Sequence, residues 1–298
     1  MPGATFAHLT ERSVVRVSGE DVHHFLQNLI TADMDKIDAA GSGFGALLTP
    51  QGKILFDFLI FAQNGTYLLD TPSQTGADFI KRLTFYRLRA KVAIEDISET
   101  HSVFAVWGEA KIDCEPAACW LDPRVAVLGQ RLYGKADDIK ASLESAGATE
   151  AGHTAYAAHR ISLGVPESLT DFDYSSIFPH DADMDALNGV SFSKGCYVGQ
   201  EVVSRVHHRG TARKRFIQVT SDNALPDAGT DIVSGDISVG QLTSSTQLED
   251  GTSKGIALTR LDKVVANRSD ETPFSCGGVA VDLAIPDWAS FTWPDSDT

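Results

Sequence analysis

The chain has 298 residues, of which 43% are hydrophobic and 22% charged, so it can bury ordinary cores and is neither disordered nor collagen-like. At about 100–200 residues per domain, this length predicts two or three domains. The formal net charge of −15 argues against non-specific coating of duplex DNA, because that binding needs Lys and Arg to neutralise phosphates.

The cysteine count and the hydropathy pattern indicate a reduced, cytosolic-type protein. Four cysteines do not make a disulfide framework. The most apolar run, residues 54–61, is too short to cross a bilayer and contains the carboxylate of Asp57. The chain opens with neither a signal-peptide pattern nor a transit-peptide pattern, which favours a bacterial-type cytoplasm. We therefore expect neither a membrane nor duplex DNA as a partner.

Strands and helices alternate over roughly the first half of the chain. Apolar residues at every second position predict strands, and a spacing of three to four residues predicts helices. The glycines at 41–45 are expected to form a turn, and Asn64-Gly65 predicts a hairpin. The predicted strands are 13–17, 53–61, 66–69, 92–94, 103–107 and 125–128, and the predicted helices are 22–29, 73–83, 137–146 and 156–163.

The second half of the chain differs in composition and periodicity. Residues 171–190 are rich in Asp, Ser and Pro without a clear period, and loops of this length are often functional. After residue 212, short β segments are separated by Gly, Asp and Ser, which predicts a small all-β barrel or sandwich without a helix. The expected β segments are 216–219, 232–233, 237–242, 255–258 and 279–283.

The segment with the strongest chemical character surrounds Cys196. Gly195 and Gly199 lie on either side of it, so the backbone can turn sharply and approach a ligand. Lys194 lies two residues before the thiol, and a cation that points the same way lowers the pKa of a thiol. A lone cysteine is more often a buried small hydrophobe, but the glycines and the lysine favour a functional interpretation. Cys196 and Lys194 are therefore the candidate catalytic residues.

Two basic runs stand out on this acidic chain. Residues 81–91 contain five Lys and Arg without an acid, and residues 194–215 contain six with one acid. Such runs could attract a phosphate, an RNA or a polycarboxylate, although both could also be solvated faces. His207 and His208, if they lie on a strand, point to opposite faces and do not ligate one ion, so we expect no resident metal.

The octapeptide Lys194–Glu201 resembles K-G-C-[FY]-x-G-Q-E, the signature of the YgfZ family of folate-binding proteins. The run from His207 to Arg215 is especially similar to the mitochondrial iron–sulfur assembly branch of that family. One departure is Pro179-His180-Asp181, where the family often has Pro-x-Glu. Further similar segments are 18–27 (the opening helix), 50–54 (P-x-G-[KR]), 88–92 (L-R-x-K-V), 160–166 (R-I-x-x-G-x-P) and 240–244 (G-x-[LV]-T-S).

This resemblance implies an α+β fold, the three-domain cloverleaf of the glycine cleavage T-protein. In that fold two interleaved ferredoxin-like domains are followed by a C-terminal β-barrel. The implied boundaries are 1–45 with 136–212, 46–135, and 213–298. The implied cofactor is tetrahydrofolate, or a one-carbon derivative of it, in a central cleft. The residues then expected to contact folate are Asp57, Arg89, Tyr197, Gln200, Glu201, Arg205 and Arg213.

The resemblance also implies a role in assembly or repair of [4Fe–4S] proteins, which in bacteria include radical enzymes that modify tRNA. The implied partners are folate, iron–sulfur assembly proteins or [4Fe–4S] clients, and tRNA indirectly. The implied location is the bacterial cytoplasm, or the mitochondrial matrix for a eukaryotic source.

Three functions follow as hypotheses, and the first is preferred. The first is a folate-dependent maturation factor in which Cys196 acts as nucleophile, one-carbon or sulfur acceptor, or transient cluster ligand. The second is an aminomethyltransferase-like, tetrahydrofolate-dependent transferase with Asp57 as the key acid and no need of Cys196. The third is a non-catalytic adaptor that docks protein or tRNA through a basic face including Arg209 and Arg213. The sequence is therefore compatible both with a tetrahydrofolate-dependent transferase and with a non-catalytic factor.

Overall fold

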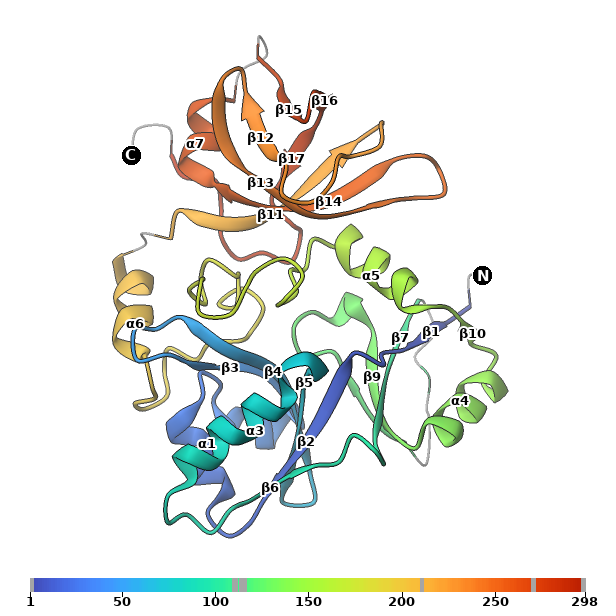
Figure 1. Ribbon diagram of the computed structural model, residues 1–298, viewed down its shortest axis with the longest axis vertical. Coiled ribbons are helices and arrows are strands. Elements are labelled where there is room, and N and C mark those ends of the chain that lie inside the picture. The colour runs from blue at the N-terminus through green and yellow to red at the C-terminus, as the bar shows by residue number, and fades with distance from the viewer. Residues whose placement is uncertain (1–2, 109–111, 113–116, 210–211, 269–271, 296–298) are drawn as a thin grey trace. The chain divides into compact units, whose positions relative to one another are not determined.

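The computed structural model describes residues 3–108, 112, 117–209, 212–268 and 272–295. The chain forms two compact units (Figure 1). The first unit comprises residues 1–156 and 187–200, and the second comprises residues 157–186 and 201–298. No helix of the described residues is long and apolar enough to cross a membrane.

The first unit contains two five-stranded sheets. One has the order β3-β4-β5-β2-β6, and all of its strand pairs are antiparallel. Alternation along β4 turns Phe56 and Phe58 toward Phe79 of helix α3 (Ser73–Arg87), with ring centroids 5.3 and 4.8 Å apart. The strands are β2 (Arg12–Ser18), β3 (Ser42–Leu48), β4 (Ile54–Gln63), β5 (Thr66–Pro72) and β6 (Ala93–Asp96).

The expected turn at 41–45 is wrong, because all but its first residue belongs to β3. Gly41 alone turns, with φ 81° at the C-terminal cap of α2 (Met34–Ala40). A Cβ on Gly43 would lie 2.5 Å from Cγ1 of Ile37, so this glycine lets α2 pack closely on the sheet. Helix α1 (Val22–Leu29) starts as expected, but no side chain caps its N-terminus.

The other sheet of the first unit has the order β10-β1-β7-β9-β8. Helix α4 (Ala136–Ser145) packs its Ile139 and Leu143 into a core with Phe6 and Phe104. Between the sheets, the buried Asp70 accepts hydrogen bonds from Arg12 (2.5 Å) and Tyr133 (2.8 Å). The strands are β1 (Thr5–His8), β7 (Ser102–Trp107), β8 (Ala118–Leu121), β9 (Gln130–Gly134) and β10 (Thr149–Glu150). The predicted strand at 125–128 is wrong, because residues Ala126–Leu128 form the 3-10 helix η1, which precedes β9.

The second unit is dominated by a nearly closed barrel with the strand order β16-β15-β12-β13-β14-β11-β17 (Figure 1). Its core contains Ile217, Val239 and Leu242, which are at most 1% exposed. The strands are β11 (Lys214–Ser221), β12 (Asp231–Ser234), β13 (Ile237–Gln247), β14 (Ser253–Arg260), β15 (Phe274–Cys276), β16 (Val279–Ala280) and β17 (Asp282–Ala284).

Two expectations about this half of the chain are wrong. A short helix, α7 (Leu261–Ala266), lies within the region expected to be all β. His207 and His208 lie on helix α6 (Gln200–Arg209), not on a strand. Helix α5 (His153–Ser162) links the two units along the chain. The α+β class is confirmed, while the proposed three-domain boundaries remain a prediction.

Candidate functional site

The signature segment forms a loop that ends where helix α6 begins at Gln200. Along this loop burial alternates sharply. Lys194 and Tyr197 are 9% and 7% exposed, whereas Gly195 and Cys196 between them are exposed. The loop therefore presents the thiol to solvent and buries the side chains of Lys194 and Tyr197.

Lys194 is the first anchor of this loop. Its Nζ donates to the carbonyl oxygens of Ile30 (2.9 Å) and Ala32 (2.5 Å), directly after helix α1. Burial lowers the pKa of Lys194 to about 8, and the charges of Asp33 and Asp35 oppose this shift. The sequence suggested that Lys194 acts on the thiol, but its amine is bound to these backbone carbonyls.

Tyr197 packs beneath the same amine. The Lys194 Nζ lies 5.5 Å from the centroid of the Tyr197 ring, within the range of a cation–π contact. The buried hydroxyl of Tyr197 has no hydrogen-bond partner among the described residues, and burial raises its pKa to about 12. A buried hydroxyl without a partner is costly, so it is a candidate contact for a polar ligand.

Gly199 is the second anchor. It has φ +80°, which favours glycine, and a Cβ there would lie 2.6 Å from the carbonyl oxygen of Thr49 and 3.0 Å from Cα of Gly52. The signature therefore rests on the turn at 50–52 that the sequence also singled out. Only a residue without a side chain fits this close approach of two backbones.

The residues before the signature are held by Thr31. Its hydroxyl donates to the carbonyl of Gly189 (2.6 Å) and accepts from the amide of Ala46 (2.8 Å). Its own carbonyl accepts from the amide of Ser191 (2.9 Å). Three segments distant in the chain are thus joined at one buried threonine, which fixes the approach to the Cys196 loop.

Cys196 is the one exposed cysteine among the residues that the structure describes. Cys119 is half-buried, with its sulfur 2.9 Å from the amide of Gln130, and Cys276 is buried with a raised pKa. Cys114 lies outside the described residues. A thiol on an anchored loop and open to solvent can attack an electrophile or ligate iron as a thiolate.

Asp57 and Arg89 lie in different kinds of surroundings on the first unit. Asp57 is half-buried and projects from β4 on the face opposite to Phe56 and Phe58. Arg89 follows helix α3, which covers the Phe56 and Phe58 face, and it is exposed. The structure shows no contact between these two predicted folate-binding residues.

The basic run at 205–215 is largely neutralised within the second unit. Arg205 pairs with Glu201 one turn away on α6 (2.9 Å), and Arg213 lies 3.7 Å from Asp262. Arg215 is buried and binds Asp185 with both terminal nitrogens, at 2.6 and 2.8 Å. Gln200 is half-buried at the start of α6. This run therefore carries less unpaired positive charge than its composition suggests.

Two other sequence motifs meet at the buried carboxylate of Asp171. The guanidinium of Arg160 donates to Oδ2 (2.8 Å), and the hydroxyls of Thr243 and Ser244 both donate to Oδ1 (2.7 Å). The amide of Glu167 completes the set at 2.9 Å. These motifs are therefore structural, because they fix residues 160–171 to strand β13 of the barrel.

Asp181 was noted in the sequence only as a departure from the family's Pro-x-Glu, and the acidic cluster at 180–185 around it was not predicted. Burial raises the pKa of Asp181 to about 6 against the pull of Lys214 and Arg215, and it raises the pKa of Asp183 well above its usual range. Oδ2 of Asp183 is buried without a partner among the described residues. Burial, with help from Arg215, lowers the pKa of His180 to about 4. The aspartates at every second position were the available signal.

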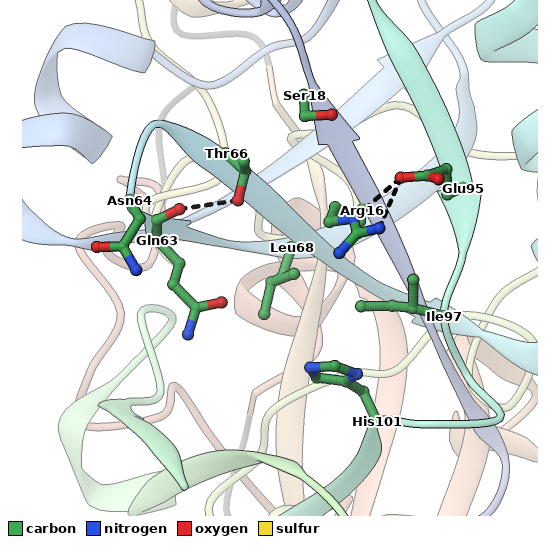
Figure 2. A pocket seen from close by; sticks show the side chains of 9 residues that line it. All are labelled: Arg16, Ser18, Gln63, Asn64, Thr66, Leu68, Glu95, Ile97 and His101. Atoms are coloured by element: carbon green, nitrogen blue, oxygen red, sulfur yellow. Dashed lines mark hydrogen bonds and ion pairs between the residues drawn. The ribbon is translucent and has the colours of Figure 1, made fainter. Parts of the chain in front are cut away.

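A polar cavity of about 240 Å³ lies on the first unit (Figure 2). Arg16 donates twice to one oxygen of Glu95, at 2.8 and 3.0 Å, and so occupies one wall. Burial and the charge of Arg16 lower the pKa of His101. None of the described side chains that line this cavity has a buried polar atom without a partner, so we assign no ligand to it.

The fold resembles a solved enzyme. The glycine cleavage system aminomethyltransferase T from Bartonella henselae superimposes with a TM-score of 0.72 over 95% of this chain and 85% of its own, at 13% identity. Residues 213–291 match the family model of the CAF17 C-terminal beta-barrel domain. The protein is therefore a T-protein-like α+β protein with a C-terminal barrel, as the sequence predicted.

Proteins with similar sequences identify the family within this class of fold. The mitochondrial iron–sulfur cluster assembly factor IBA57 of Homo sapiens is 30% identical over 98% of this chain and 86% of its own length. The Mycosarcoma maydis homolog of the same factor is 32% identical over 72% of this chain. The chain spans only 56% of that fungal relative. The chain belongs to the IBA57 family of iron–sulfur cluster assembly factors, which confirms the resemblance seen in the sequence.

Proposed function

We propose that this protein is an accessory factor in the assembly or repair of [4Fe–4S] proteins and that Cys196 is its working group. The observation that carries the proposal is the exposed thiol on a loop that Lys194 and Gly199 anchor at both ends. The relatives are named iron–sulfur cluster assembly factors, which supports the same role.

Cys196 would serve as a transient thiolate ligand to iron of a cluster in transit. The thiol loses its proton to solvent on binding iron and regains one when a client cysteine replaces it, so no oxidant or reductant is needed. Lys194 holds the loop and leaves the thiol unobstructed. A fixed loop lowers the ordering cost of each exchange.

Tetrahydrofolate is the proposed cofactor, and it supplies a carrier for one-carbon units. On the first unit, Asp57 offers a carboxylate for pterin amino groups, Gln200 offers an amide, and Tyr197 has a buried hydroxyl without a partner among the described residues. This donor set fits a flat polar heterocycle. Arg89, Glu201, Arg205 and Arg213 remain predicted contacts, and the last three already make ion pairs.

The partners follow from this chemistry. Clients would be apo-proteins with cysteine sites for [4Fe–4S] clusters, and in bacteria they would include radical enzymes that modify tRNA. Assembly proteins that deliver clusters would be the other partners. The location would be the bacterial cytoplasm, or the mitochondrial matrix in a eukaryote, since the human and fungal relatives are mitochondrial factors.

The test of Cys196 uses a strain that lacks its own member of this family. The measurement is the activity of a [4Fe–4S] dehydratase in anaerobic extracts. We expect the wild type and Cys119→Ser to restore activity, because Cys119 is half-buried against Gln130, and Cys196→Ser to fail. Full restoration by Cys196→Ser would contradict the role of the thiol and favour the aminomethyltransferase-like or the adaptor hypothesis, neither of which needs Cys196.

The test of folate binding is separate. We expect anaerobic calorimetry to show saturable tetrahydrofolate binding by the wild type and by Cys196→Ser, and weaker binding by Asp57→Asn. Asn keeps the shape of Asp but gives up its charge and one acceptor oxygen. A folded wild type that does not bind would remove folate from the proposal and leave the thiol test unaffected.

A further inference from the structure

The end of helix α3 and the turn after it carry two strongly exposed apolar side chains. Phe85 is 69% exposed and Leu88 is 87% exposed. Leu88 also has φ +46°, a conformation that costs free energy for a residue with a branched side chain. A strained backbone that turns a large apolar group into water does not stabilise this unit by itself, so it points to another role.

The same place carries free positive charge. Lys81, Arg82 and Arg89 are exposed and make no ion pair with any described residue. No acid lies between Asp78 and Glu95 in the sequence. We call Lys81, Arg82, Phe85, Leu88 and Arg89 the α3 tip. On the helix, residues three and four apart share a face, so Lys81 and Arg82 border Phe85.

The rest of this segment already has a structural use. Lys91 pairs with Glu20 at 2.6 Å, and its amide donates to Asp21. Val92 is buried. Lys91 and Val92, the K and V of the L-R-x-K-V motif, thus connect the turn to the start of α1. The first two, Leu88 and Arg89, have no such use and belong to the α3 tip.

We propose that the α3 tip docks on an anionic lipid surface. Two apolar side chains bordered by unpaired Lys and Arg match the boundary between acyl chains and acidic headgroups. A protein interface usually has a larger apolar centre and few lysines, and it does not form around two side chains.

The net charge of the chain does not prevent this contact. Charges more than about 8–10 Å from the membrane are screened at physiological ionic strength, so the local patch dominates. The expectation from the sequence that no membrane partner exists rested on the lack of a spanning segment. Surface docking needs none.

The experiment is flotation of the full chain with vesicles of phosphatidylcholine alone, and with vesicles containing 30% phosphatidylglycerol. It needs neither folate nor Cys196, so its failure is distinct from failure of the proposed function. We expect wild-type binding to the anionic vesicles to exceed that to neutral ones at least about tenfold at 0.1 M salt, and to fall steeply at higher salt.

Two double variants separate the two contributions. Arg82→Gln with Arg89→Gln removes two cations, each contributing roughly fivefold, so partitioning should fall at least about tenfold. Phe85→Ser with Leu88→Ser should reduce it by a similar or larger factor. The matched controls are Lys135→Gln, an exposed cation elsewhere, and Ile237→Ser, an apolar residue that is 48% exposed on the other unit.

The proposal is overturned by any of three results. One is the absence of wild-type flotation, which would favour an acidic protein, not a lipid surface, as the partner of the α3 tip. Another is equal flotation with neutral and anionic vesicles. The third is equal losses in the control variants and in the tip variants.

Discussion

The close approach of Gly199 to the turn at 50–52 predicts a large effect of one methyl group. Gly199→Ala places a Cβ 2.6 Å from the Thr49 carbonyl oxygen and forces alanine to φ +80°. The left-handed backbone costs a non-glycine residue about 1–2 kcal/mol. Overpacking a close contact costs about 1–3 kcal/mol. We therefore expect the free energy of unfolding of the first unit to fall by about 2–5 kcal/mol.

The assay combines urea denaturation with amide hydrogen exchange. Exchange should increase in residues 189–200 and 48–53, because these are the segments in contact, while the barrel should keep its protection. The rate of Cys196 alkylation by iodoacetamide reports whether the loop has loosened.

Gly195→Ala is the matched control. Gly195 is exposed and is not among the residues with positive φ, and a Cβ added to it would meet no neighbouring atom within 4 Å. Its stability change should stay within about 0.5 kcal/mol. If Gly199→Ala proves as stable as Gly195→Ala, the signature does not rest on this turn and the anchoring argument is refuted.

Two further predictions concern buried carboxylates. Asp171→Asn should lower the free energy of unfolding of the second unit by about 3–5 kcal/mol, because it removes the nearest counter-charge of the buried Arg160. The control Asp173→Asn should change stability little, since Asp173 is exposed. Equal denaturation midpoints for the two variants would contradict this prediction. Burial opposes ionisation of Asp122, but Arg124 and Arg131 outweigh it and lower its pKa to about 2. Because this folded-state pKa is depressed, the stabilisation is present above about pH 4 and is lost as the pH falls through 2. Acid titration of the first unit should show this loss in the wild type, and Asp122→Asn should lack it.

The signature shows most clearly what can and cannot be predicted from the sequence. The octapeptide predicted a functional cysteine, and the structure exposes that thiol. The sequence also suggested that Lys194 acts on the thiol because the two residues are close in the chain. The direction of a side chain depends on its acceptors, and the carbonyls of Ile30 and Ala32 lie more than 160 residues away. Spacing alone could not show them.

The basic runs show the same limit. Composition made residues 194–215 and 81–91 equivalent. Only the fold showed that Arg215 is buried against Asp185 and that Arg82 and Arg89 have no partners among the described residues. Ion pairs between distant residues are formed by packing, so a count of charges along the chain overestimates the free charge of one run and cannot rank the two.

Local patterns by themselves determined strands β2, β4, β5, β6 and β7 of the first half, the β-rich tail, the signature and the family. These properties depend on side-chain alternation and on short motifs, which neighbours in the chain define. The tertiary structure alone decided that residues 42–48 form a strand, that Thr31 joins three segments, and that Leu88 faces water under strain. Each of these depends on residues brought together from far apart, and no local pattern encodes such contacts.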